Sequence, residues 1–359
     1  MWAMIMKEFR QLRRDRRTLA MMIALPILLL VVFGYAANFN VHDIPTVVVG
    51  PHAEQTASSL HSPFHVVDVD ARGNKSTVET QLLDGKAIVG FVTTSSGVLV
   101  VMDGTQLFSV ERAETVLAHM ARANSSVSAV PVQTQILYNP NLNTSWVMVP
   151  GIAGLILVFI GTLITSLGVV RERQTGTLEQ LAVMPFRPWD VIVGKIAPYF
   201  IVAAIDLGVI IAVGMGLFHV PFVGNVATLV LGAALFLLVT LGMGILISTV
   251  SQNQGQAIQL AFMVMLPQIL LSGLIFPVAS MAAGVRWISY ILPLTYFIEI
   301  SRGVMLKGMP ISALWFPIVM LALLAVVVLG LAILRFRHDL APGGRGTETA
   351  SRDPEKVAT

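Results

Sequence analysis

One carboxylate and two amides lie inside long apolar stretches of this sequence, and they are the first residues whose chemistry needs an explanation. Asp206 sits midway along one stretch, and Gln259 and Gln268 lie within another. A carboxylate at membrane depth costs several kcal/mol unless it is neutralised, paired or hydrated, so it is by default a candidate functional group. Asp206 can recognise a cationic substrate or act as a protonatable gate, or it can be protonated and hydrogen-bond a neighbouring helix. Gln259 and Gln268 either line a substrate path or hydrogen-bond between helices.

The segment from Arg171 to Lys195, RERQTGTLEQLAVMPFRPWDVIVGK, has the pattern of a docking surface. Thr177 is a candidate N-cap for a short helix over 178–184, and prolines then end that helix and begin the next one. This short helix and its flanks carry an apolar ridge beside acidic residues, which suits a protein interface better than a solvated linker. The ridge comprises Leu178, Leu181, Phe186 and Trp189, and the acidic residues are Glu172 and Glu179.

The residue types that are missing argue against several kinds of chemistry. The chain contains no cysteine, its histidines are scattered, and no serine–histidine–aspartate arrangement is evident, so we expect neither a metal site nor a catalytic site. An intramembrane enzyme would also need a second catalytic group beside Asp206. No G-x-x-x-x-G-K-[ST] phosphate loop occurs, so we expect ATP to be bound by another chain. The formal net charge of +3 gives no support to nucleic-acid binding.

The elements that must position these residues are membrane-spanning helices. Hydrophobic residues make up 55% of the chain and charged residues 12%, against about 25% charged in an ordinary soluble domain. A spanning helix needs about 20 predominantly apolar residues, and a helix pairs its own backbone amides within hydrocarbon. Six segments qualify as spans: 19–37, 146–170, 196–218, 225–250, 257–278 and 314–334.

Basic residues predict the orientation of these spans. They cluster before the first span, between the second and third, and after the last, whereas the 219–224 connection between the third and fourth has none. The positive-inside rule therefore places both termini and the 171–195 loop in the cytoplasm. Alternatively, the first apolar block is a secretory signal cleaved near Tyr35-Ala36-Ala37, which would leave five spans. Because the block is long for a signal, we favour an uncleaved anchor.

Residues 38–145 form a polar, turn-rich block that we expect to be a small α/β domain on the outer side of the membrane. Its alternating segments predict strands, and helical spacing predicts two helices. The strands are expected at 45–50, 64–69, 87–92 and 97–102, the last ending at an Asp103-Gly104 turn, and the helices at 76–83 and 109–123. The predicted fold class is thus an all-α polytopic membrane protein with six transmembrane helices, plus an inserted α/β extracytoplasmic domain.

Three further segments complete the predicted organisation. Residues 1–18 form an amphipathic helix with an apolar stripe and many cations, which suits the cytoplasmic interface of the membrane. Residues 279–313 are too apolar for a plain outer loop, and Trp287, Tyr290 and Tyr296 suit the interface level, so we expect short re-entrant or interfacial helices there. Residues 335–359 are predicted to be a cytoplasmic, disordered tail, since it is rich in Gly, Pro and charge from Ala341 onward.

Two stretches resemble the membrane subunits of ABC-2 type exporters. The first is E-x(3)-GTLEQL-x(3)-P-x(8)-GK, from Glu172 to Lys195, and the second is LSGLIFP from Leu271, followed by ISYILPLTYFIEISRG from Ile288. The amphipathic first helix, the large outer domain and the six spans also fit, so the resemblance covers nearly the whole chain. The sequence is similar to bacterial export permeases of the kind implicated in drug efflux, which implies a multi-pass protein of the bacterial plasma (inner) membrane.

The resemblance implies a role for the 171–195 loop and a set of partners. In that family the loop carries the coupling helix, which sits in a groove of the ATPase; the alternative is a purely structural turn. The implied partners are two ATPase subunits that bind ATP and Mg, a second permease subunit that is identical or different, membrane lipids and, as a further candidate, a periplasmic adaptor. No cofactor is expected on this chain. The residues that would transmit the ATPase stroke are Glu172, Gly176, Thr177, Leu178, Glu179, Leu181 and Pro185, together with Trp189 of the ridge.

The resulting functional hypothesis is the permease subunit of an ATP-driven exporter that moves drug-like or amphiphilic substrates out of the cytoplasm or the inner leaflet. Export of a lipid or a glycan-linked lipid is an alternative substrate class. An ion-driven secondary transporter that uses Asp206 is an alternative mechanism. A receptor fits less well, because short loops and a short tail offer no cytoplasmic output domain.

Overall fold

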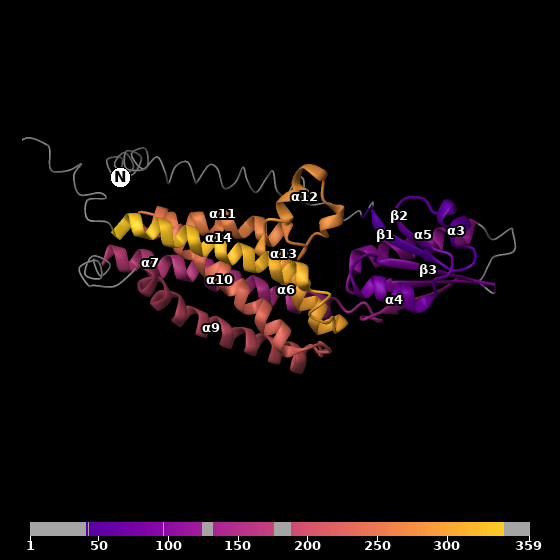
Figure 1. Ribbon diagram of the computed structural model, residues 1–359, viewed down its shortest axis with the longest axis horizontal. Coiled ribbons are helices and arrows are strands. Elements are labelled where there is room, and N and C mark those ends of the chain that lie inside the picture. Colours follow the sequence, from indigo (N-terminus) through magenta and orange to yellow (C-terminus); the bar gives the residue numbers. More distant parts are fainter. Residues whose placement is uncertain (1–40, 42, 96, 124–131, 176–187, 341–359) are drawn as a thin grey trace, which may run out of the picture.

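The computed structural model describes residues 41–340 except 42, 96, 124–131 and 176–187. Within these residues, five helical segments are long and apolar enough to cross a membrane: Thr144–Gln174, Ile196–Leu217, Val226–Val250, Gln254–Leu271 and Trp315–Arg335. They lie side by side in a bundle, and a domain built on a β-sheet extends from one end of the bundle (Figure 1). The predicted first span, 19–37, and the amphipathic helix of residues 1–18 lie outside the described residues.

The second predicted span is one continuous rod of three helical pieces. It consists of α6 (Thr144–Val158), the π-helical turn η1 (Phe159–Ile164) and α7 (Thr165–Gln174). Next along the chain come α9 (Pro188–Leu217), α10 (Val226–Val250) and α11 (Gln254–Leu271), and α14 (Trp315–Leu340) is the last described helix. α10 packs against α14, α9, α11 and both halves of the rod, so it forms the centre of the bundle.

Close packing around α10 depends on its small residues. A Cβ added at Gly232 would lie 2.8 Å from the Ile300 side chain, and one at Gly242 would lie 2.9 Å from Val328. At Gly244 an added Cβ would overlap the carbonyl oxygen of Gly161 in η1. Glycines at these positions therefore allow neighbouring backbones to approach, as small residues do between membrane helices.

Two predicted boundaries are wrong. The fifth span was expected to continue to residue 278, but α11 ends at Leu271, because the chain turns at Gly273, whose φ of +86° favours glycine. The predicted tail was placed at 335–359, but α14 continues to Leu340. Nothing in 335–340 breaks a helix, and the residue before Pro342 is the first that is disfavoured in helical conformation.

The sheet domain contains five strands in the order β2-β1-β3-β4-β5. β1 pairs in parallel with β2 and β3, β4 pairs antiparallel with β3, and β5 pairs in parallel with β4. The strands are β1 (Ile44–Val49), β2 (Phe64–Asp70), β3 (Val89–Thr94), β4 (Gly97–Asp103) and β5 (Val132–Leu137), and the helices are α3 (Ala53–Ser59), α4 (Lys75–Leu83) and α5 (Leu107–Ala123).

Helices cover both faces of this sheet. α3 and α5 pack with Val48, Phe91 and Met102 on one face, whereas α4 packs with Val47 and Val101 on the other. The four expected strands and two expected helices are present. β5 and α3 were not predicted, since β5 is a largely exposed edge strand rich in Gln and α3 is a single short helix.

Between α11 and α14 the chain forms the short helices expected for the 279–313 segment. These are α12 (Ala283–Ser289), α13 (Pro293–Arg302) and the π-helical turn η3 (Gly303–Lys307), preceded by a 3-10 turn, η2 (Val278–Ser280). Trp287 and Tyr290 are exposed, as interfacial aromatics would be. Tyr296, which was expected at the same level, is instead buried, and its hydroxyl donates to the carbonyl of Tyr290.

Candidate coupling and transport sites

At the end of the bundle remote from the sheet domain, the second span is fastened to the α10–α11 connection. Arg173 in the last turn of α7 donates from Nη1 to the carbonyls of Ser248, at 2.9 Å, and Ser251, at 3.1 Å. The side chain of Gln254 donates to that of Gln174 over 2.9 Å. A displacement of the chain that follows α7 would therefore reach α10 and α11 directly.

The predicted coupling residues lie at this end of α7 and in the chain beyond it. Glu172 lies in the last turn of α7, and Trp189 lies in the first turn of α9, which begins at Pro188 as expected for a proline-started helix. The other predicted coupling residues lie outside the described residues: Gly176, Thr177, Leu178, Glu179, Leu181 and Pro185.

Asp206 lies in α9 and is half-buried. It borders a face of this helix against which none of the described residues packs. Its neighbours Ile201 and Ile205 are 60% and 61% exposed. No ion pair or hydrogen bond joins its carboxylate to any residue that the structure describes. In Figure 1, α9 and α11 lie on opposite sides of the bundle, so the structure does not bring Asp206 together with Gln259 and Gln268.

The two glutamines of α11 have polar atoms that are buried without a hydrogen-bond partner in the described part of the chain. In Gln268, which is fully buried, this holds for both Oε1 and Nε2, and in Gln259 it holds for Oε1. The hydroxyls of Ser272, one turn beyond Gln268, and of Thr162 in η1 are in the same state. A buried polar group without a partner costs about 1–3 kcal/mol, so these atoms require a water, a ligand or a different packing state.

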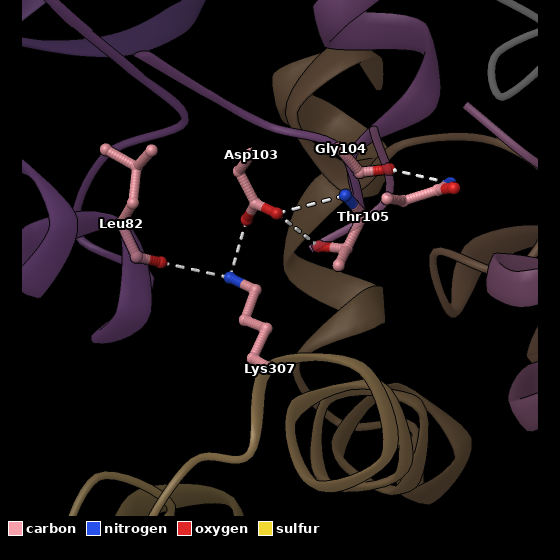
Figure 2. A network of polar contacts seen from close by, with 6 residues as sticks. Leu82, Asp103, Gly104, Thr105 and Lys307 are labelled. Carbon is pink, nitrogen blue, oxygen red and sulfur yellow. Dashed lines mark hydrogen bonds and ion pairs between the residues drawn. The ribbon is translucent and has the colours of Figure 1, made fainter. Parts of the chain in front are cut away.

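At the other end of the bundle, a lysine from η3 enters the sheet domain (Figure 2). Nζ of Lys307 lies 2.5 Å from Oδ2 of Asp103 at the end of β4, and it donates to the carbonyl of Leu82 over 3.0 Å. The other carboxylate oxygen of Asp103 accepts from the amide of Thr105, at 3.0 Å, and from its hydroxyl, at 2.7 Å. Nζ also lies 5.4 Å from the centre of the Tyr138 ring, within the range of a cation–π interaction.

Arg302, at the end of α13, makes a second connection at this end of the bundle. Its Nε donates to the carbonyl of Val147 in α6 over 3.1 Å, and Nη1 donates to that of Gly273 over 3.3 Å. The guanidinium also lines a small cavity whose wall includes Gln106 and Phe108 of the sheet domain. Arg302 thus joins the second span, the turn after α11 and α13 in one place.

Tyr138 lies beside the buried pair, and its surroundings predict a measurable titration. Burial, together with the charges of Asp103 and Glu79, raises the pKa of the Tyr138 phenol from its ordinary value of 10.0 to about 12. Because the folded pKa exceeds the unfolded one, the stabilisation by the neutral phenol is complete below the unfolded pKa and is lost as pH rises through the folded pKa. We expect the tyrosinate absorbance that disappears in Tyr138→Phe to titrate near pH 12. Titration of that component at the ordinary tyrosine pKa would contradict the described environment.

Comparison with known proteins decides the family. The family described as ABC-2 family transporter protein matches residues 16–334, which is most of the chain. The chain belongs to the ABC-2 transporter family. It is therefore the membrane permease of an ABC exporter, and the contacts of Arg173 and Lys307 lie in an ABC-2 permease.

Relatives of this ABC-2 permease carry matching names. The chain is 28% identical to the probable multidrug ABC transporter permease YbhS of Escherichia coli, over 94% of this chain and 97% of that protein. It is 28% identical to the probable multidrug ABC transporter permease YbhR, over 88% of this chain and 92% of that protein. Its identity to the inner membrane transport permease YhhJ is 29%, over 60% of this chain and 58% of that protein.

Sequence reasoning on the ABC-2 permease missed Arg173, Lys307 and the role of Asp103. Asp103 was noted only as part of a turn signal, and the turn is present. A lysine in an otherwise apolar segment before the last span is the signal that could have drawn attention to Lys307, since such a cation needs a partner when it is buried.

Proposed function

We propose that this ABC-2 permease couples ATP hydrolysis on a separate ATPase to the export of drug-like or amphiphilic substrates. The observation that carries the proposal is the family match over residues 16–334 in a chain that lacks a phosphate loop. The multidrug names of two relatives, each aligned over nearly its whole length, support the substrate class. Family membership favours ATP hydrolysis as the energy source over an ion gradient, the alternative that the position of Asp206 suggested.

The working assembly would contain two copies of the ATPase, which hold ATP and Mg, and a second permease subunit. Both termini and the 171–195 loop would face the cytoplasm, where the loop would dock on the ATPase. The fastening of Arg173 to Ser248 and Ser251 supports this role, because a stroke delivered to the loop would be passed to the centre of the bundle.

A substrate path along α11 fits the unpaired polar atoms of Gln259 and Gln268. Buried amide atoms are stabilised when a passing molecule, or the water that precedes it, supplies hydrogen bonds. Ser272 continues this polar row toward the turn that receives Arg302. We assign no such role to Asp206, which lies on the opposite side of the bundle.

The test of the proposed function is purification of the tagged chain in mild detergent, with identification of bound proteins and assay of ATP hydrolysis. We expect a stoichiometric ATPase that is lost when Leu178 and Leu181 are replaced by asparagine. The matched control replaces Val67 and Val69, exposed residues of β2, by asparagine and should retain the ATPase. A chain that purifies without an ATPase, under conditions where a known transporter complex survives, would contradict the proposal.

Replacement of Gln268 by methionine tests the substrate path. Methionine has a similar volume and no unpaired amide, so we expect a gain in stability of about 1–2 kcal/mol, measured by thermal unfolding in detergent. We expect transport in membrane vesicles to fall, since the hydrogen-bonding group of the path is gone. Gln133→Met, at an exposed position of β5, is the control and should change neither. Lower stability with unchanged transport would show that Gln268 is a structural hydrogen-bonding residue.

A further inference from the structure

We propose that Lys307 is a positioning residue of the transport cycle, because it joins the sheet domain to the outer ends of the spans so that they move as one unit. The inference rests on the proposed export function, and it assigns the sheet domain a mechanical part in that function.

The cation of Lys307 lies in a buried environment. The side chain of Lys307 is 8% exposed and that of Asp103 is 2% exposed, so their 2.5 Å contact is an ion pair withdrawn from water. The carbonyl of Leu82 that also accepts from Nζ lies in the last turn of α4, where the helix dipole favours a cation. Removal of one partner from a buried pair leaves an uncompensated charge and is strongly destabilising. The junction is therefore expected to resist separation during movements that leave the fold intact.

Asp103 is held rigidly and is linked to the second span. Its Oδ1 is occupied by the amide and hydroxyl of Thr105, which leaves Oδ2 directed at Lys307 (Figure 2). The side-chain amide of Asn139 donates to the backbone carbonyls of Gly104 and Asn143, and Asn143 directly precedes α6. The turn that carries this carboxylate is thus linked to the N-cap of the rod α6–η1–α7.

The π-helical turn η3 connects the outer ends of three other spans, α9, α10 and α14. It follows α13 and leads to α14. Its carbonyls at Val304 and Met305 accept from the amides of Gly224 and Val223, both over 3.0 Å, in the connection between α9 and α10. An added Cβ at Gly224 would lie 2.5 Å from the carbonyl oxygen of Val304, so this contact is between backbones. If these ends separate to release a substrate, η3 must move, and the buried pair requires the sheet domain to move with it.

The test uses the complete permease with its ATPase, reconstituted in lipid vesicles. For Lys307→Met we expect the ATPase to remain bound, ATP hydrolysis to change by less than about twofold, and transport to fall by roughly tenfold or more, the factor that corresponds to about 1.4 kcal/mol. Lys307→Arg should recover part of the transport, because it keeps the charge. Lys75→Met is the control, since Lys75 is a partly exposed lysine of α4 that pairs with Glu79. Normal transport by Lys307→Met would overturn the proposal.

A second variant covers the case in which Lys307→Met does not fold. The chain has no cysteine, so Asp103→Cys/Lys307→Cys carries a unique pair of thiols that a short bifunctional reagent can join. Transport per ATP hydrolysed is measured on the same preparation before and after cross-linking. A rise after cross-linking supports one moving unit, whereas no change or a fall shows that the junction is irrelevant or must open. Either result is obtained with the ATPase bound, so it is separate from a failure of the proposed function, in which no ATPase would bind.

Discussion

A permease in which Gly244 is replaced by valine is expected not to accumulate as a folded protein. A Cβ at this position would overlap the carbonyl oxygen of Gly161 and would lie 3.0 Å from the Cβ of Thr165 and 3.1 Å from the carbonyl oxygen of Thr162. Two of these three atoms belong to the backbone of η1, which cannot rotate away as a side chain can. Overpacking in a closely packed core typically costs about 1–3 kcal/mol, and rigid neighbours raise that cost.

The measurement for Gly244→Val is the yield of monodisperse protein in detergent and its thermal unfolding temperature. Gly208→Val is the matched control, because an added Cβ at Gly208 in α9 meets nothing within 4 Å. We expect the control to be produced like the unmodified chain. Equal unfolding temperatures for both variants would show that η1 and α10 are not in the described contact.

Reversal of the charge at Glu179 is expected to abolish transport. Glu179 lies outside the described residues, so the prediction rests on the resemblance of the 171–195 loop to a coupling helix and on its acidic rim. Glu179 is expected to face a cationic part of the ATPase, so a lysine there would set like charges against each other, which costs several kcal/mol at an interface. The ATPase should therefore bind less tightly, while membrane insertion stays intact.

Three measurements on Glu179→Lys separate these effects: membrane content, ATPase recovered with the purified permease, and transport in vesicles. Glu111→Lys, at an exposed position of α5, is the matched control and should behave like the unmodified chain. Normal transport by Glu179→Lys would remove the basis for assigning the coupling role to this loop.

The parts of the fold that could be predicted are those that local sequence determines. A run of about 20 apolar residues predicts a span without reference to the rest of the chain. Short runs rich in valine, bounded by turn residues, likewise placed β1 to β4. The edge strand β5 contains two glutamines, and three of its six residues are exposed, so its sequence lacks the apolar pattern that predicts a strand. The end of α11 depends on the backbone conformation at Gly273, which follows from the packing of the turn and not from its composition.

The candidate sites divide in the same way. Glutamines in an apolar segment are visible in the sequence, and Gln268 is indeed buried. The association of Lys307 with the sheet domain was not visible, because Lys307 and Leu82 are 225 residues apart and neither has a local pattern that specifies the other. Asp206 was predicted from the cost of a charge at membrane depth. That cost does not indicate which side of a helix is covered by protein. The separation of Asp206 from α11 could therefore be found only in the structure.

The π-helical turn η1 has an evolutionary consequence. A π-helical turn inside a helix contains one residue more than an α-helical turn needs, so it marks a point where the span can lose that residue while its two halves keep their faces. A deletion anywhere else in the rod would rotate one half by about 100° relative to the other. Length variation among homologous second spans is therefore expected to concentrate at Phe159–Ile164.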